Sequence, residues 1–412
     1  LKYNSMSDAV DKKKLNIIVI GTGMYVCGRG ADGYGTILPA IYEWKKSGLA
    51  GDVYIAGTRP DSIRAVREKA AILDKLYGFT VNINYYPKNE MNDPEAYKKA
   101  INDIPKPACA IVVVPDDLHR TVAGYAVENS LHTLVVKPLA PTIKETLELI
   151  ELQEGHNVYC AVEFHKRFDR SNLKLKDAIS SNRIGEPLYF IVEYSQRKSI
   201  PTEKFKKWVE TTNIFQYLGI HYADIIYWAT GAVPLRVMAV GQKNFLVSHG
   251  IDAYDSIQAV IEWKMPSGNI FTSSFFTNWV DPENTSAMSD QRIKVIGTKG
   301  RYEANQKKRG ICLVTDDSGI EEPNPDFCSM YGIAAGDVSF RGYGIESVLQ
   351  FLTDVCGIES GVLNIAGLDG RRPTFKDSVI PVAIIEAVNK SLAGNGKWIN
   401  VKSNHGESIT LE

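Results

Sequence analysis

Short runs of β-branched and aliphatic residues alternate with longer amphipathic stretches over residues 15–141. The short runs predict strands at 16–20, 53–56, 110–114 and 133–136. The stretches between them predict helices at 36–46, 61–77, 93–101 and 118–129. Strands that alternate with helices in this way form a parallel sheet with helices on its faces. This part of the chain is therefore expected to be a βαβ domain.

The rest of the chain has a different pattern, in which strands predominate from residue 188 onward. A helix, a strand and a second helix are expected first, at 143–154, 158–162 and 171–180. Later runs alternate apolar and polar residues, which predicts a mixed or antiparallel sheet with one covered face; they lie at 188–194, 256–263 and 269–275. We therefore expect an α/β protein with a first domain at 13–141 and an α+β domain at 142–412. A late apolar helix at 379–391 could pack back on the first domain.

Length and charge limit the classes of partner. A chain of 412 residues is long enough for two domains. Its net charge of -1 provides no bulk attraction for nucleic acid or an anionic membrane. The six cysteines are scattered, without a CxxC pair or zinc spacing, which indicates reduced thiols. The apolar run at 15–20 is too short for a membrane span or signal core. We expect a cytoplasmic protein without nucleic-acid or membrane partners.

A glycine-rich segment follows the first predicted strand directly, where a dinucleotide-binding turn would lie. The mechanism of such a turn needs small residues, so that the backbone can approach a pyrophosphate at a helix N-terminus. The candidate cofactor-binding residues are Gly21, Thr22, Gly23, Met24 and Tyr25. Val26 occupies the third glycine position of GxGxxG, so the turn is expected to be expanded. The alternative is a flexible glycine loop without a ligand.

The end of the second predicted strand bears on the choice between NAD and NADP. A site that prefers NAD usually has a carboxylate there, which accepts a hydrogen bond from the ribose 2′-hydroxyl. Here Thr58 and Arg59 occupy that place, and both can bind a phosphate. NADP is therefore slightly favoured over NAD. Arg59 could instead stack on the adenine or lie in solvent.

Polar residues also end the two later strands of the first domain. Ligands bind beyond the carboxyl ends of the strands in open parallel sheets, so Lys137 is expected to face the cofactor crevice. Its alternative role is a surface lysine that closes a strand. Pro115 and His119 follow the preceding strand. No HExxH or comparable metal-ligand spacing occurs, and no metal is expected.

Six motifs follow one another along the chain. They are the glycine turn, residues 115–119, Lys137-Pro138, and residues 163–169, 219–224 and 291–300. In this order they resemble the glucose–fructose oxidoreductase, inositol dehydrogenase and MocA (Gfo/Idh/MocA) family of NAD(P)-dependent enzymes. The resemblance implies an N-terminal Rossmann domain and a C-terminal domain with an open, largely antiparallel sheet. It also implies a homo-oligomer, either a dimer or a tetramer.

The resemblance also implies roles for individual residues. Lys137 would donate a hydrogen bond to the reacting oxygen, and His221 would be the general acid and base. Pro115 and His119 would contribute to the cofactor site. The residues His165 and Arg167 would contact the nicotinamide or the substrate. Their alternatives are a satisfied helix histidine for His221 and solvated helix-start residues for His165 and Arg167.

Two aromatic residues complete the predicted site. Trp279 is expected in a loop after a strand, with Asn278 and Asp281 beside it, where an aromatic ring suits a hydroxyl-rich ligand. Tyr217 stands four residues before His221, where the family usually has an Asp. We expect its phenol to bind a substrate hydroxyl. The alternative is that Tyr217 delivers the proton itself, with its pKa lowered by Lys137.

The sequence thus predicts a dehydrogenase or reductase that moves a hydride between a nicotinamide and a sugar, inositol or related polyol. One alternative is a non-catalytic regulator of the same fold that binds dinucleotide and a sugar-pathway ligand. Another is an enzyme with a tightly held cofactor that oxidises a sugar transiently.

Overall fold

The first sheet is parallel throughout and is built from the first part of the chain. The computed structural model describes residues 14–412, apart from 32, 206–207, 333, 335 and 405–407, so residue 13 of the predicted first domain lies outside it. The strand order is β3-β2-β1-β4-β5-β6. The strands are β1 (Leu15–Ile20), β2 (Ala50–Ala56), β3 (Ile83–Tyr86), β4 (Ala108–Val112), β5 (His132–Val136) and β6 (Cys160–Glu163). This order confirms the predicted Rossmann architecture.

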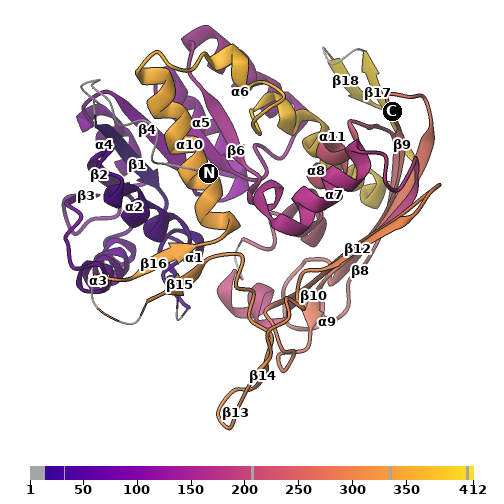
Figure 1. Cartoon of the computed structure of the whole chain (residues 1–412), viewed down its shortest axis with the longest axis horizontal. Helices are drawn as coiled ribbons and strands as arrows, with labels where there is room; N and C mark the ends of the chain where they lie inside the picture. The colour runs from indigo at the N-terminus through magenta and orange to yellow at the C-terminus, as the bar shows by residue number, and fades with distance from the viewer. Residues whose placement is uncertain (1–13, 32, 206–207, 333, 335, 405–407) are drawn as a thin grey trace.

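Alternate residues of each strand point to opposite faces of this sheet, and both sets are buried in β1, so helices cover both faces. Ile17 and Val19 pack against α2 (Ile37–Lys46) and α3 (Pro60–Tyr77). On the other face lie α4 (Ala96–Asp103), α5 (His119–Glu128) and α6 (Ile143–His156). A helix from much later in the chain, α10 (Tyr343–Glu359), joins the first face beside α2 (Figure 1). The sequence analysis did not predict α10.

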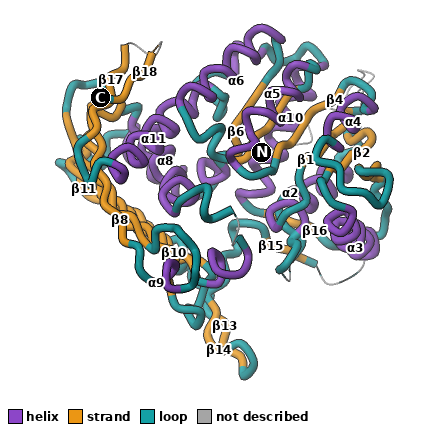
Figure 2. Tube along the Cα trace, turned by 180° about the vertical axis from the view of Figure 1, so that it is seen from behind, coloured by secondary structure: helices purple, strands orange, loops and turns teal. Residues whose placement is uncertain are grey.

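The second sheet is mixed and largely antiparallel, as predicted. Its order is β12-β11-β7-β10-β9-β8-β17-β18, and β7 and β10 are the parallel pair. The strands are β7 (Pro187–Arg197), β8 (Val233–Gln242), β9 (Ser256–Lys264), β10 (Ile270–Asp281), β11 (Ser289–Gly297), β12 (Arg301–Asn305), β17 (Ile399–Asn404) and β18 (Ser408–Leu411). Helices α7 (Arg170–Ser180), α8 (Ile220–Thr230) and α11 (Val379–Ala393) cover one face (Figure 2).

The predicted domain boundary at residue 141 does not separate the two sheets. Strand β6 pairs with β5, so the first sheet extends beyond residue 141. Helix α11 lies mainly on the second sheet, although Ile385 reaches the core of the first. Short hairpins, β13 (Leu313–Thr315) with β14 (Gly319–Glu321) and β15 (Ser329–Tyr331) with β16 (Ser339–Arg341), lie between β12 and α10. The β13–β14 hairpin projects away from both sheets (Figure 1).

Candidate active site

The glycine-rich turn after β1 has a conformation that only glycine accommodates. Gly21 has a φ of 126°, and a Cβ there would overlap the carbonyl oxygen of Val113. Gly23 precedes the single-turn helix α1 (Met24–Cys27) and has open space where a Cβ would lie. The loop then continues through Gly28, whose φ is 71°, before α2 begins. The turn is therefore longer than a GxGxxG turn.

The end of β2 lies next to this turn and is open to solvent. A Cβ at Gly57 would collide with the buried side chain of Thr22, so the two loops are in close contact. Thr58 and Arg59 are exposed, and Arg59 precedes α3. Among the residues that the structure describes, Arg59 forms no ion pair. Its guanidinium is therefore available to a ligand.

The end of β4 is fixed by a buried histidine. His119 has its Nδ1 2.7 Å from the carbonyl oxygen of Pro138 and its Nε2 2.9 Å from that of Val114. Both ring nitrogens thus face backbone oxygens. His119 therefore ties the ends of β4 and β5 together and has no free nitrogen for a cofactor, while the neighbouring Pro115 is exposed.

Asp116, beside Pro115, is held by a segment from the second half of the chain. Its carboxylate accepts hydrogen bonds from Trp208 Nε1 at 2.8 Å and from Thr212 Oγ1 at 3.2 Å. Gln216 Nε2 also donates to it. The segment that carries these donors therefore covers the end of β4, where the crevice of the Rossmann sheet begins.

Lys137 lies at the neighbouring strand end and contacts Tyr217. Its ammonium donates a hydrogen bond to the carbonyl oxygen of Tyr217 and lies 4.1 Å from the centre of that ring. Burial lowers the pKa of Lys137 to about 7, although the charges of Asp116 and Glu163 oppose the shift. The lysine is therefore not the fully solvated surface residue of the alternative hypothesis.

Tyr217 lies in the π-helical turn η5 (Phe215–Gly219), which leads directly into α8. Its ring packs edge-on against Trp208, at a centroid distance of 5.1 Å, and lies tilted against Trp279, at 5.8 Å. Burial raises the pKa of the Tyr217 phenol above 10, even though Lys137 is close. This direction is opposite to the lowered pKa expected for proton delivery by Tyr217, and the role of Tyr217 in proton transfer stays a prediction.

The two predicted histidines meet at this point. The ring centroids of His165 and His221 are 4.8 Å apart, and both side chains are buried. His165 Nδ1 lies 2.8 Å from Glu163 Oε2. Tyr25 of the glycine-rich turn stacks on His165, with a centroid distance of 6.1 Å. Residues from the glycine-rich turn, from the end of β6 and the turn after it, and from α8 thus converge close to Lys137.

The structure assigns different surroundings to Arg167 and Trp279. Arg167 is buried and donates three hydrogen bonds to Asp224, at 2.6, 2.9 and 3.2 Å. Trp279 is fully buried and lies within β10, not in a loop as predicted, because the strand continues to Asp281. Its Nε1 lies 3.3 Å from Gln196 Oε1. Both residues are buried, and neither is a solvated helix-start or loop residue.

Sequence reasoning missed three buried charged residues near the site. Glu163 and Asp116 are 2 % and 3 % exposed, and each follows or ends a strand of the parallel sheet. Lys166 is also buried, and its ammonium donates to Gln291 and Gln306 inside a ring of tyrosines. The rule that ligands bind at the carboxyl ends of strands could have identified Glu163 and Asp116. No sequence signal indicated the partners of Lys166.

Two family models match the chain, and together they cover most of both sheets. Residues 68–164 match the model described as the oxidoreductase family, NAD-binding Rossmann fold. Residues 172–303 match the model of the GFO/IDH/MocA C-terminal domain. The chain belongs to the Gfo/Idh/MocA oxidoreductase family. This membership confirms the resemblance found in the sequence motifs.

Individual members of the Gfo/Idh/MocA family are distant relatives of this chain. It is 25% identical to myo-inositol 2-dehydrogenase of Thermotoga maritima over 267 residues, which is 64% of this chain and 71% of that protein. It is 24% identical to inositol 2-dehydrogenase of Rhizobium meliloti over 221 residues, which is 53% of this chain and 63% of that protein. The chain therefore spans just under two thirds of the length of the Rhizobium relative.

Solved structures share the fold over nearly the whole length. An inositol dehydrogenase homologue from Azotobacter vinelandii, solved with NADH and myo-inositol, superposes with a TM-score of 0.69 at 17% identity, over 94% of this chain and 98% of that one. GenD2 from gentamicin A biosynthesis, solved with NAD, has the same TM-score at 15% identity, over 95% and 97%. At these identities the likeness shows the fold alone.

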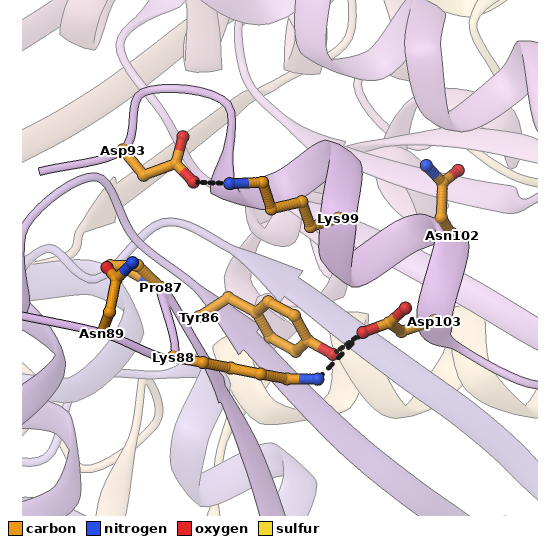
Figure 3. A pocket seen from close by; sticks show the side chains of 8 residues that line it. All are labelled: Tyr86, Pro87, Lys88, Asn89, Asp93, Lys99, Asn102 and Asp103. Atoms are coloured by element: carbon orange, nitrogen blue, oxygen red, sulfur yellow. Dashed lines mark hydrogen bonds and ion pairs between the residues drawn. The ribbon is translucent and has the colours of Figure 1, made fainter. Parts of the chain in front are cut away.

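A surface hollow of about 380 Å³ lies apart from the residues described above, beside the edge strand β3 (Figure 3). Its lining consists of Tyr86, Pro87, Lys88, Asn89, Asp93, Lys99, Asn102 and Asp103. The charged side chains pair with one another, Lys99 with Asp93 at 2.6 Å and Lys88 with Asp103 at 3.0 Å. Because none of the predicted site residues lines it, the candidate active site lies elsewhere.

Two kinds of feature are absent from the described part of the chain. No group of three or more His, Cys, Asp and Glu side chains there could hold a metal ion. None of its helices is long and apolar enough to cross a membrane.

Proposed function

We propose that this chain is an NAD(P)-dependent dehydrogenase that transfers a hydride between the nicotinamide and a hydroxyl or carbonyl carbon of a sugar, inositol or related polyol. The observation that carries the proposal is the meeting of Lys137 with two histidines at the carboxyl ends of β5 and β6. His221 Nδ1 is buried without a hydrogen-bond partner among the described residues. A buried polar atom of this kind favours a polar ligand, because leaving it unpaired costs about 1–3 kcal/mol.

The residues at the amino-terminal turn fit a dinucleotide. Gly21 allows the backbone to pass close to β4, and the space beside Gly23 leaves room for a pyrophosphate. Met24 and Tyr25, which follow it, are partly exposed. Thr58 and Arg59 would hold the 2′-phosphate of NADP, so NADP is proposed as the preferred cofactor. Relatives named as inositol dehydrogenases and structures solved with NAD(H) support the cofactor class and the substrate class.

The chemistry follows from the charges at the strand ends. The nicotinamide, when bound, supplies the acceptor or donor of the hydride. Lys137 would donate a hydrogen bond to the reacting oxygen and stabilise the negative charge that develops on it. Its ammonium has three hydrogens, of which Tyr217 accepts one, so two remain for the substrate. One of the two histidines would exchange the substrate's proton.

A panel of sugars, inositols and sugar acids tests the proposal, with reduced nicotinamide followed by absorbance for each cofactor. We expect turnover with at least one polyol, and less than about a hundredth of that rate in Lys137→Met. Dinucleotide binding without turnover across the panel would favour the regulator of the same fold. Cofactor absorbance in the purified protein would favour the enzyme with a tightly held cofactor.

The homo-oligomer also stays a proposal. The face of the second sheet that carries no helices exposes apolar side chains, among them Tyr189, Val240 and Phe276. Apolar groups on an open face favour association with a second copy. Light scattering should give the mass of a dimer or tetramer, whereas the mass of a monomer, 45.7 kDa, would contradict it. The cytoplasmic location remains a prediction from the cysteine pattern.

A further inference from the structure

His221 has bases as its charged neighbours. Burial, and then the charges of Lys137, His165 and Lys166, lower the pKa of His221 well below 6.5. A proton on His221 would add a positive charge close to two lysines. Its Nδ1 also lacks a partner among the described residues. These surroundings favour a neutral imidazole.

His165, the adjacent imidazole, has a carboxylate as its closest charged neighbour. Its Nδ1 lies 2.8 Å from Oε2 of Glu163, and the phenol oxygen of Tyr25 lies 3.4 Å from the same nitrogen. The other oxygen of Glu163 accepts a hydrogen bond of 2.6 Å from Ser347. The ring is stacked between Tyr25 and Tyr343, with centroid distances of 6.1 and 5.7 Å. These contacts fix the position of the ring.

A carboxylate on one ring nitrogen has two effects on a histidine. It selects the tautomer with the hydrogen on Nδ1, which leaves the lone pair on Nε2, and it stabilises the imidazolium that forms when Nε2 takes a proton. The titratable groups that surround the histidine pair are Tyr25 of α1, Lys137 at the end of β5, Glu163 of β6, Lys166 of η3 (His165–Phe168), Tyr194 of β7 and Tyr343 of α10. Glu163 is the only carboxylate in this set.

We propose that His165, held and charge-compensated by Glu163, is the proton-transfer group of this site, and that His221 is a neutral hydrogen-bonding group. The proposal rests on the dehydrogenase function proposed above. It assigns to His165 the role that the family resemblance gives to His221. Glu163 is a positioning residue, because it acts through His165.

In alcohol oxidation the substrate loses two hydrogens, one as a proton and one with its electron pair. The hydroxyl proton of the substrate passes to Nε2 of His165, the carbon-bound hydrogen leaves with its electron pair to the oxidised cofactor, and the C–O bond becomes C=O. The products are a ketone, the reduced cofactor and an imidazolium paired with Glu163. The imidazolium then returns its proton to water. In the reverse direction the imidazolium protonates the forming alcohol.

Histidine NMR titration of the protein without cofactor tests the proposal directly. Each of the seven histidines can be assigned by single His→Gln variants. We expect the His221 ring to be the later of the two to take up a proton as the pH falls, because burial and the neighbouring positive charges lower its pKa. Glu163→Gln should move the titration midpoint of His165 down by about 1–2 pH units, because it removes an opposite charge at hydrogen-bond distance. The matched control Ser347→Ala removes one neutral hydrogen bond and should move it much less.

Two results would overturn the proposal. One is uptake of a proton by His221 at a higher pH than by His165. The other is an unchanged His165 midpoint in Glu163→Gln. The wild-type titration alone decides the first point, so the proposal stays testable if Glu163→Gln does not fold.

Kinetics add a second readout. His165→Gln should lower kcat at least about 100-fold, whereas His221→Gln should mainly raise KM. Because the pKa of Lys137 is about 7, a limb of the pH profile near neutrality could belong to the lysine. If one limb of the pH–rate profile moves in Glu163→Gln by the same amount as the NMR midpoint of His165, that limb belongs to His165. Absence of turnover with every polyol would refute the dehydrogenase function, and the titration would still decide which histidine carries the proton.

Discussion

The ion pair between Arg167 and Asp224 should be one of the most costly interactions to break in this protein. The side chains are 6% and 1% exposed, and three hydrogen bonds of 2.6 to 3.2 Å join them. Asp224→Asn removes the compensating charge and leaves the guanidinium buried. Removing one partner of a buried pair typically costs about 3–5 kcal/mol. Asp377 lies 3.9 Å from the remaining nitrogen of Arg167 and offers partial compensation, so we expect a value near 3 kcal/mol.

Urea unfolding of Asp224→Asn, Arg167→Met and the double variant measures this cost as a double-mutant cycle. The matched control is the pair Arg236 and Glu262, which has bonds of 2.7 and 2.6 Å but is 42% and 25% exposed. Glu262→Gln should cost less than about 1 kcal/mol. Equal costs for the two pairs would refute the reasoning from burial. Unchanged stability of Arg167→Met with a raised KM would instead assign the guanidinium to the substrate.

Three further predictions concern the cofactor and Lys137. Arg59→Ala should weaken NADP binding by about 1.5–3 kcal/mol and leave NAD affinity nearly unchanged, as measured by fluorescence titration. If the wild type binds NAD at least tenfold more tightly than NADP, the proposed preference for NADP is contradicted. Lys137→Met should retain cofactor affinity and lose most turnover, a barrier increase of about 2.7–4 kcal/mol, and wild-type rates would remove Lys137 from the mechanism. The pKa of Lys137 is about 7 in the folded chain and 10.5 without the fold, so the unfolded chain binds more protons between these values. Urea unfolding at several pH values should therefore show that the wild type gains stability relative to Lys137→Met as the pH rises from 7 to 10. The gain should be at most about 1.4 kcal/mol per pH unit. A stability difference that stays constant with pH would contradict the lowered pKa.

Periodicity was sufficient to predict the first sheet and the fold class. Each strand from β1 to β6 except β3 is a short aliphatic run, and local pattern fixes such strands because both of their faces are buried. The short strand β3, with its tyrosines, carries little of this pattern. Helix α10 and strands β8 and β17 were missed as well. Strand β17 pairs with β8 across more than 150 residues of sequence, as in Ile399 with Val237, and periodicity contains no information about such pairing.

The candidate site was predictable residue by residue but not as a set of contacts. Lys137, His165 and His221 stood out by position or motif, and the structure brings them together. The role of Arg167 was not predictable, because its partner Asp224 is 57 residues away and the sequence alone cannot pair them. His119 likewise gives both ring nitrogens to backbone carbonyl groups, which no motif shows. Polar residues near a strand end thus divide into those for which we propose a role toward the substrate and those that hold the strand end in place.

The lowered pKa of Lys137 fits its proposed role, in which an opposite charge develops at hydrogen-bond distance during the reaction. Burial destabilises the ammonium in the free protein, while the carbonyl oxygen of Tyr217 orients it without neutralising it. Under the proposed mechanism, an oxygen that gains negative charge beside it would add an opposite charge at hydrogen-bond distance, so the interaction would be stronger in the transition state than in the ground state. Glu163 supplies such a charge to His165 permanently. Under the proposed mechanism, His165 would take the substrate's proton beside Glu163 and Lys137 would stabilise the oxyanion, so proton transfer and oxyanion stabilisation would fall to different residues.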